Sequence, residues 1–305
     1  MSGQTDNRAP SFIGIGAEKS ATTWVWSKLD QHPAIEMSQP KELNFFNLEF
    51  DRGLAWYGRH FPGSPGCLQG EISPWYMDDD RVADRIADLF PNVKLLVMLR
   101  DPFDRAFSHL LHAAQNEYGG IADLTADQLR RLAALSDDYV RRSCYALGLS
   151  RFFELFPRER IGIFFHDDVQ ACPQDLICRI YEFLGVDSGF LPDGLETPLN
   201  KSQNYRSETL HRVASTMCET ARSFPVTRHL LEWIYRRTTL RERAIEMLMV
   251  DSGRPLLTAE DVLSEDQLSR ISDDLRCLQH DLRIEVPASW TARRTAVCSA
   301  ETVAG

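Results

Sequence analysis

A short apolar strand that leads directly into a lysine and a helix start limits this chain's fold more than any other feature. Residues 12–16 are apolar or glycine, the next turn carries Lys19, and small and hydroxyl residues follow at 20–23. In such a turn the N–H groups of a helix N-terminus and the positive end of the helix dipole lie beside a mobile cation. We therefore predict an α/β protein in which this turn binds an oxyanion such as phosphate. A structural turn without a ligand is the alternative.

The turn differs from the P-loop of nucleotide kinases, which reads G-x-x-x-x-G-K-[ST]. Ile13 and Glu18 occupy the two glycine positions. A carboxylate would repel a triphosphate, and isoleucine lacks the backbone freedom of glycine. Such kinases also hold Mg²⁺ with an acidic residue, whereas the strand predicted at 93–99 is followed by Arg100. A nucleotide or small-molecule kinase is therefore disfavoured but stays open, and a magnesium-dependent ATPase assay would decide it.

Arg100 begins a second candidate anion site. Asp101 suits a helix N-cap and Pro102 the first helical position, so a helix is expected to start there. Ser108 follows the cap by nearly two helical turns and can share its face. Arginine offers a phosphate a forked pair of donors, and serine adds a hydroxyl. The alternative is a structural Arg–Asp pair with a solvent-facing serine.

Two anion sites on one sheet suggest a nucleotide with phosphates at two positions. Residues 19–24 resemble the 5′-phosphosulfate loop of sulfotransferases that use PAPS (3′-phosphoadenosine 5′-phosphosulfate), and residues 100–108 resemble their 3′-phosphate motif. The resemblance implies a P-loop-like three-layer fold with a mainly parallel sheet and a helical C-terminal part. It implies PAPS as co-substrate and PAP as product. The donor contacts it implies are Lys19, Ser20, Ala21, Thr22, Thr23, Trp24, Arg100 and Ser108.

Residues 41–46 resemble the K-E-x-x-F-F segment of Golgi heparan-type sulfotransferases and their bacterial relatives. In those enzymes the glutamate is the general base, which implies this role for Glu42. An exposed glutamate without a role is the alternative. A histidine base, as in the cytosolic small-molecule branch, would point to His109 or His112. Phe45 and Phe46 are expected in the core in either case.

Further segments extend the resemblance over residues 11–290. Residues 70–76 resemble a segment that lines the acceptor cleft, but Ile72 stands where heparan-type enzymes carry a lysine, which disfavours an anionic glycan. Lys201 and Arg206 lie in a stretch that resembles the loop closing over the donor. The family usually has glycine where Ala21 stands, and we expect Ala21 to adopt ordinary helical angles.

The resemblance implies a division of labour. Lys19 would stabilise the leaving phosphate, and Glu42 would take a proton from an acceptor hydroxyl or amine. No metal is expected. The acceptor is a small molecule, glycan or natural product whose identity the sequence leaves open. A non-catalytic nucleotide-binding protein is the remaining alternative.

Composition narrows the cellular setting. The 305 residues carry a formal charge of −10, which argues against a nucleic-acid binder. Seven cysteines without a C-x-x-C pair suggest reduced thiols and no zinc site. The longest apolar run, 93–99, is too short to span a membrane. We expect a cytoplasmic protein without a nucleic-acid or membrane partner, and the oligomeric state cannot be read.

The expected organisation is an N-terminal tail at 1–10, one sulfotransferase domain at 11–290 and a mobile tail at 291–305. Alternating patterns predict a parallel sheet with strands at 12–16, 67–72, 93–99 and 160–165. Helices are predicted at 81–90, 138–156, 173–184, 207–222, 227–237, 240–250 and 264–282. An arginine cluster at 228–243 could receive an acidic acceptor, although pairing with neighbouring glutamates is the simpler interpretation.

Overall fold

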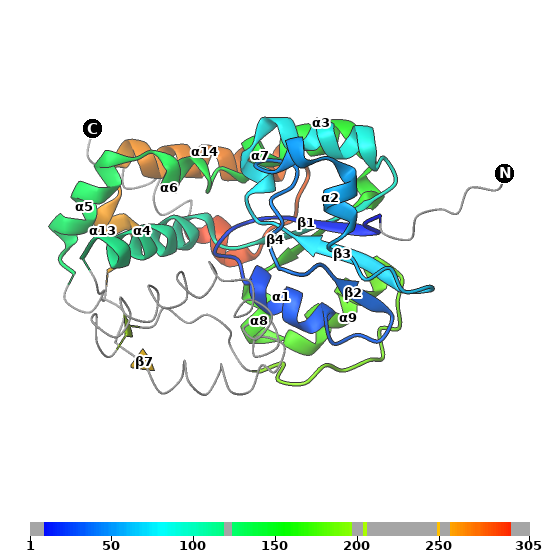
Figure 1. Cartoon of the computed structure of the whole chain (residues 1–305). Coiled ribbons are helices and arrows are strands. Elements are labelled where there is room, and N and C mark those ends of the chain that lie inside the picture. Colours follow the sequence, from blue (N-terminus) through cyan, green and yellow to red (C-terminus); the bar gives the residue numbers. More distant parts are fainter. Residues whose placement is uncertain (1–8, 119–123, 197–203, 206–248, 251–256, 294–305) are drawn as a thin grey trace.

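Five parallel strands form the central sheet of the computed structural model, which describes residues 9–118, 124–196, 204–205, 249–250 and 257–293 (Figure 1). The order across the sheet is β2-β3-β1-β4-β5. All four predicted strands are confirmed to within a residue at each end. Strand β2 was missed because three residues are too few to show a pattern. The strands are β1 (Phe12–Gly16), β2 (Ile35–Met37), β3 (Leu68–Ile72), β4 (Lys94–Leu99) and β5 (Ile161–Phe165).

Alternating side chains of the strands build two helix-covered faces. On one face, Phe12 and Leu96 pack with α1 (Thr22–Leu29) and α9 (Pro173–Leu184). On the other, Ile13 and Leu95 belong to a core shared with three more helices: α3 (Asp80–Leu89), α7 (Tyr145–Leu155) and α14 (Glu265–His280). Figure 1 shows these two layers below and above the sheet. The predicted P-loop-like, three-layer α/β fold is thereby confirmed.

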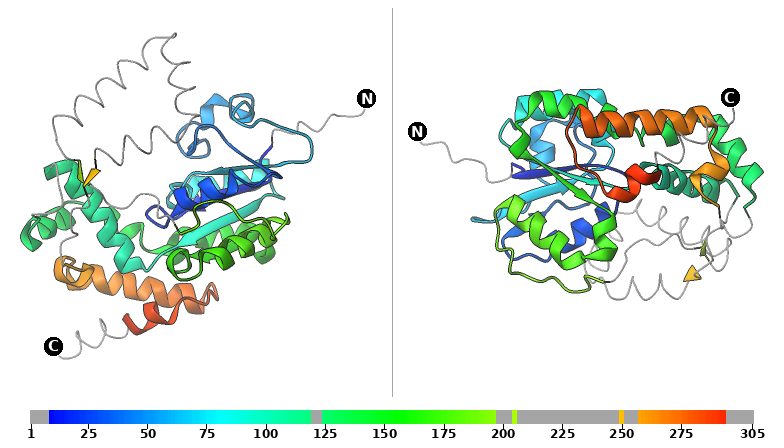
Figure 2. Two further views of the ribbon diagram at one scale, coloured as in Figure 1. Left: turned by 90° about the horizontal axis from the view of Figure 1, so that it is seen from below. Right: turned by 180° about the vertical axis from the view of Figure 1, so that it is seen from behind.

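A third group of helices lies where α4 leaves β4, at one end of the sheet (Figure 2). Its own apolar core joins residues of α4, α5, α6, α13 and the start of α14. The bounds of these and the other helical elements are α2 (Leu54–Gly58), α4 (Pro102–Tyr118), α5 (Ala126–Leu135), α6 (Asp138–Arg141), α8 (Asp167–Ala171), α13 (Ala259–Val262), and the 3-10 turns η1 (Phe50–Arg52), η2 (Tyr76–Asp78) and η3 (Arg158–Arg160).

The single long helix predicted at 138–156 is wrong. The structure has two helices, because α6 ends at Arg141 and α7 begins at Tyr145. The buried guanidinium of Arg105 explains the break. Its Nη1 donates to the Tyr139 carbonyl at 3.2 Å and to the Ser143 hydroxyl at 3.3 Å, so it captures polar groups at the end of α6.

In the C-terminal part, the described residues test the last predicted helix and the end of one other. Helix α14 agrees with the prediction at 264–282, and Ser264 caps it by accepting a hydrogen bond from the Gln267 N–H. The predicted helix at 240–250 is wrong in its last two residues, which form β7 (Met249–Val250) antiparallel to β6 (Asn204–Tyr205). The remaining predictions in this part lie outside the described residues: Lys201, Arg206, the arginine cluster at 228–243, and the helices at 207–222, 227–237 and 240–248. In the described part of the chain, no helix is long and apolar enough to cross a membrane.

Candidate active site

The Lys19 loop and Arg100 lie at the same edge of the sheet. Strands β1 and β4 are parallel neighbours, with Gly16 opposite Val97. The segments that follow the two strands therefore leave the sheet at the same edge. The first N–H after β1, that of Ala17, donates to the Met98 carbonyl at 2.7 Å. The Tyr145 hydroxyl donates to the Arg100 carbonyl at 2.9 Å and also faces Ser20. The two candidate anion sites therefore share a strand pair and a common neighbour.

The loop at 17–21 has an unusual backbone. Lys19 has φ 66° and Ala21, the residue before α1, has φ 60° and ψ 24°. Both are left-handed conformations, which favour glycine. The expectation that Ala21 adopts ordinary helical angles is therefore wrong. Alanine has a steric cost in this region that glycine lacks, so the contacts around the loop must offset it.

Glu18 and a buried arginine provide such contacts. The side chain of Arg105 is 0% exposed, and its Nε donates to the Glu18 carbonyl at 3.3 Å. The Glu18 carboxylate lies 3.7 Å from Arg105 Nη2 and 3.5 Å from Arg142 Nη1. The carboxylate that argued against a nucleotide P-loop is thus paired by cations and holds the loop against α4 and the α6–α7 connection.

Lys19 supplies the mobile cation. Its side chain is 22% exposed and its Nζ lies 3.9 Å from the Glu18 carboxylate. Burial lowers the pKa of Lys19, while the charges of Glu18 and Glu42 oppose this shift. The N–H groups in the first turn of a helix point out of its N-terminus, here toward the loop. The residue before α1, Ala21, has no side-chain acceptor to cap them.

The other residues of this motif divide into two sets. Ser20 and Thr22 are buried and Thr23 is partly buried. The ring of Trp24 lies in the core, where its indole N–H donates to the Leu195 carbonyl at 3.2 Å. Only the backbone of Trp24 is therefore available to a ligand at the loop.

Glu42 lies in a second loop with a left-handed backbone. Its φ is 63°, its side chain is 44% exposed, and its carboxylate pairs with Lys41. Phe45 and Phe46, which follow it, are buried in the core as predicted. The segment reaches this edge of the sheet through Ser73, whose hydroxyl accepts the Asn44 N–H at 3.0 Å and whose own N–H donates to the Gly14 carbonyl of β1 at 2.9 Å.

The competing histidines also lie near Lys19. Burial and the charge of Arg105 lower the pKa of His109 to about 4, and its ring packs against Tyr139 at 5.0 Å between centroids. Burial and the charge of Lys19 lower the pKa of His112. Both imidazoles are therefore neutral at neutral pH.

Arg100 lies directly before the start of α4, as predicted. Asp101 Oδ1 accepts the N–H groups of Phe103 at 2.9 Å and Asp104 at 3.0 Å, which confirms the N-cap. Arg100 Nη2 lies 4.0 Å from Asp104 Oδ2. Ser108 lies two turns into α4 and is partly buried. An open pocket of about 600 Å³ adjoins this helix start, and its lining includes Arg100, Asp104, His166, Asp167, Trp290 and Arg293.

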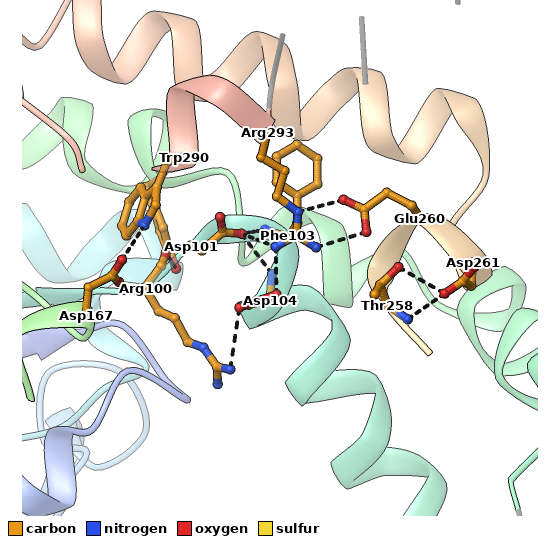
Figure 3. Close-up of polar contacts among 11 residues, drawn as sticks. Arg100, Asp101, Phe103, Asp104, Asp167, Thr258, Glu260, Asp261, Trp290 and Arg293 are labelled. Carbon is orange, nitrogen blue, oxygen red and sulfur yellow. Dashed lines mark hydrogen bonds and ion pairs between the residues drawn. The ribbon is translucent and has the colours of Figure 1, made fainter. Parts of the chain in front are cut away.

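Sequence reasoning missed Arg293, which lies within the predicted C-terminal tail. Its guanidinium contacts Asp101 at 3.1 Å and Asp104 at 2.7 Å, and it forms a bidentate pair with Glu260 (Figure 3). Asp104 is thereby shared between two arginines. No local sequence signal marks this contact, because the partners are 189 residues apart in the chain.

Comparisons with known proteins agree on one family. The model described as the sulfotransferase family matches residues 68–190. The membrane-associated sulfotransferase kil1 of Dictyostelium discoideum is 37% identical over 103 residues, 32% of this chain and 22% of that protein. The bifunctional heparan sulfate N-deacetylase/N-sulfotransferase 3 of Homo sapiens is 28% identical over 200 residues, 60% of this chain and 23% of that protein. The chain thus spans less than a quarter of the length of these curated relatives.

A solved structure supports the same assignment. The sulfotransferase from Alicyclobacillus acidocaldarius matches with a TM-score of 0.55 and 27% sequence identity, over 64% of this chain and 87% of that chain. The family match contains Arg100 and Ser108 but begins after Lys19 and Glu42. Taken together, the family match, the relatives and the shared fold support a sulfotransferase family for this chain.

Proposed function

We propose that this protein transfers a sulfuryl group from PAPS to a hydroxyl or amine of an acceptor. The observation that carries the proposal is the convergence of three motif segments at one edge of the sheet. The Lys19 loop and Arg100 follow neighbouring parallel strands, and the Glu42 loop is bonded through the Asn44 N–H to Ser73, which follows β3, the other parallel neighbour of β1. In open α/β sheets this edge, beside the point where strand order reverses, is where ligands bind.

The donor set fits a nucleotide with phosphates at two positions. Lys19 and the uncapped N-terminus of α1 offer charge and N–H groups to a 5′-phosphosulfate. Arg100 and Ser108 would hold the 3′-phosphate and so select PAPS over nucleotides that lack it. We keep Lys201 and Arg206 as additional donor contacts on the strength of the family resemblance alone.

Each catalytic group has one task. PAPS supplies an activated sulfuryl group, whose transfer resembles phosphoryl transfer in its in-line geometry and in the charge that grows on the leaving oxygen. Lys19 stabilises that charge through its ammonium group. Glu42 accepts the proton that the acceptor loses. Its exposure leaves it accessible to an acceptor arriving from solvent.

The acceptor is proposed only as a class. A matched relative is named for heparan sulfate N-sulfation. Ile72 stands at the position where the resemblance implies a lysine in heparan-type enzymes, and it is fully buried in the same core cluster as Phe12 and Trp24. Because this position offers an acceptor no positive charge, we propose an acceptor that is less anionic than heparan sulfate, with a hydroxyl or amine as the attacking group.

Transfer of radiolabelled sulfate from PAPS tests the proposal. The purified protein is incubated with ³⁵S-PAPS and a panel of uncharged glycans, amino sugars, phenols and aliphatic alcohols, and PAP release is followed in parallel. Labelled product from at least one acceptor supports the proposal. Magnesium-dependent ATP hydrolysis without any sulfuryl transfer would replace it with the kinase alternative.

A further inference from the structure

A buried carboxyl group lies beneath the loop that carries Glu42. Glu71, on β3, is fully buried and accepts three side-chain hydroxyl groups. Tyr57 Oη donates to its Oε1 at 2.7 Å, Tyr76 Oη donates to the same oxygen at 2.9 Å, and Ser73 Oγ donates to Oε2 at 2.9 Å. Burial raises the pKa of Glu71 to about 7, while the hydroxyl groups and the Leu43 N–H act in the opposite direction.

Two of these hydroxyls also hold the Glu42 loop. Ser73 Oγ accepts the Asn44 N–H at 3.0 Å, and Tyr76 Oη accepts the Phe45 N–H at 2.8 Å. A hydroxyl has one proton and two lone pairs. Because Glu71 takes each proton, the lone pairs are left to face the loop. The carboxyl group thereby orients both hydroxyls as acceptors for backbone N–H groups.

The loop needs such support. Glu42 has φ 63° and Asn44 has φ 50°, so two residues with side chains adopt left-handed angles within three positions. These angles cost free energy for residues other than glycine, and they persist only where surrounding contacts determine them. The N–H groups of Leu43, Asn44 and Phe45 meet the carboxyl group or its two hydroxyl partners, and this run directly follows Glu42.

We propose that Glu71 is a positioning residue that fixes Glu42 beside Lys19, acting through the hydroxyls of Ser73 and Tyr76. The inference rests on the proposed role of Glu42 as general base. Glu71 itself is buried beneath the loop and does not reach an acceptor. Its effect is to restrict Glu42 to the arrangement in which proton transfer occurs.

The two tyrosines provide a matched pair of variants. Tyr57→Phe and Tyr76→Phe each remove one buried hydroxyl bonded to the same oxygen of Glu71, but only the Tyr76 hydroxyl contacts the loop backbone. For Tyr76→Phe we expect kcat to fall about tenfold, the scale of one lost hydrogen bond, with the KM for PAPS unchanged. For Tyr57→Phe we expect less than a threefold change. Equal losses in both variants, or a Tyr76→Phe effect confined to KM, would overturn the inference.

Amide hydrogen exchange gives a readout that needs no acceptor. In Tyr76→Phe the amides of residues 43–46 should exchange faster than in the wild type, while in Tyr57→Phe they should not. Equal exchange at these amides in both variants contradicts the inference even if both remain active. If the wild type transfers no sulfate, the proposed function fails, and the exchange experiment still decides whether this network holds the loop.

Ser73→Ala keeps the test decisive if Tyr76→Phe does not fold. It removes the hydroxyl that links Glu71 Oε2 to the Asn44 N–H and leaves both tyrosines in place. Faster exchange at residues 43–46 and a loss of kcat without a change in PAPS KM are expected. Wild-type exchange and wild-type kcat would overturn the inference.

Discussion

The two ends of the proposed donor site are built in opposite ways. The Lys19 loop has left-handed residues, and the buried Arg105 holds it from α4. Arg100 instead precedes an ordinary helix start, in which Asp101 is the N-cap and partly exposed ion pairs reach Arg293. The Lys19 loop is held by residues far away in the chain, which fix the position of its charge. The start of α4 beside Arg100 is instead determined by neighbouring residues. We therefore expect substitutions at the first end to reduce turnover and substitutions at the second to reduce affinity.

Substitution of Glu42, the proposed base, should give the largest loss of turnover. Glu42→Gln removes the proposed base but keeps the shape of the side chain, so kcat should fall by about 10²- to 10⁴-fold. PAP binding, measured by calorimetry, should stay within about twofold, since the base does not hold the nucleotide. His112→Gln is the control, with kcat near that of the wild type. Loss of PAP binding in Glu42→Gln would show that Glu42 is structural.

Removal of the Lys19 ammonium group should give the next largest loss of kcat. Lys19→Ala should lower kcat at saturating PAPS by at least about a hundredfold, the scale of losing one preorganised charge-stabilising donor. Single-turnover kinetics would separate this loss from slow product release. Unchanged turnover would remove Lys19 from the mechanism and erase the contrast between the two ends.

Substitution of Arg293 tests whether the Arg100 end of the site determines nucleotide affinity. In Arg293→Ala, Asp101 and Asp104 lose their partner, and Asp104 competes for Arg100 against an incoming phosphate. Partly exposed ion pairs contribute at most about 1 kcal/mol, so PAP affinity should fall by about two- to fivefold with kcat unchanged.

A second substitution isolates the charge effect at this end. Asp104→Asn in the Arg293→Ala background should restore PAP affinity in calorimetry. Glu260→Gln, which leaves Arg293 on both aspartates, is the control with wild-type affinity. Tighter PAP binding in Arg293→Ala would contradict this account of the Arg100 pocket.

Ala21 gives the smallest expected effect. A residue with a side chain in the left-handed region costs roughly 1–2 kcal/mol, and glycine avoids this cost. Glycine also loses more backbone entropy on folding, which offsets up to about 1 kcal/mol of the gain. Ala21→Gly should therefore raise the free energy of unfolding in urea by up to about 1 kcal/mol. Ala113→Gly, inside α4, should lower it by about 1 kcal/mol. A destabilised Ala21→Gly variant would show that the loop is not strained at this position.

The same contrast explains what could be predicted from the sequence. Apolar runs bounded by turn residues predicted the four longer strands, and Asp101 with Pro102 predicted the start of α4, since both signals are local. The left-handed Ala21 could not be predicted, because contacts far from it in the chain offset the cost. The break between α6 and α7 likewise depends on Arg105, which is 34 residues before Tyr139.

The candidate site shows the same limit. Lys19, Glu42 and Arg100 could be proposed as site residues because their motifs are short and contiguous. Glu71 lies in the segment at 70–76, yet its role depends on Ser73 and Tyr76 meeting the N–H groups of a loop 29 and 31 residues before them. A glutamate within a strand gives no sign of whether hydroxyls surround it. Positions that support a site through several distant partners become visible only in the fold.

Calorimetric titration of PAP, 5′-AMP and adenosine 3′-phosphate tests most directly whether one nucleotide bridges both ends. Hydrogen bonds to charged groups contribute about 1.5–3 kcal/mol each, so PAP should bind the wild type at least about tenfold more tightly than either monophosphate. Arg100→Ala should remove the advantage of PAP over 5′-AMP and leave 5′-AMP affinity unchanged. Equal affinities of the wild type for PAP and 5′-AMP would contradict the account.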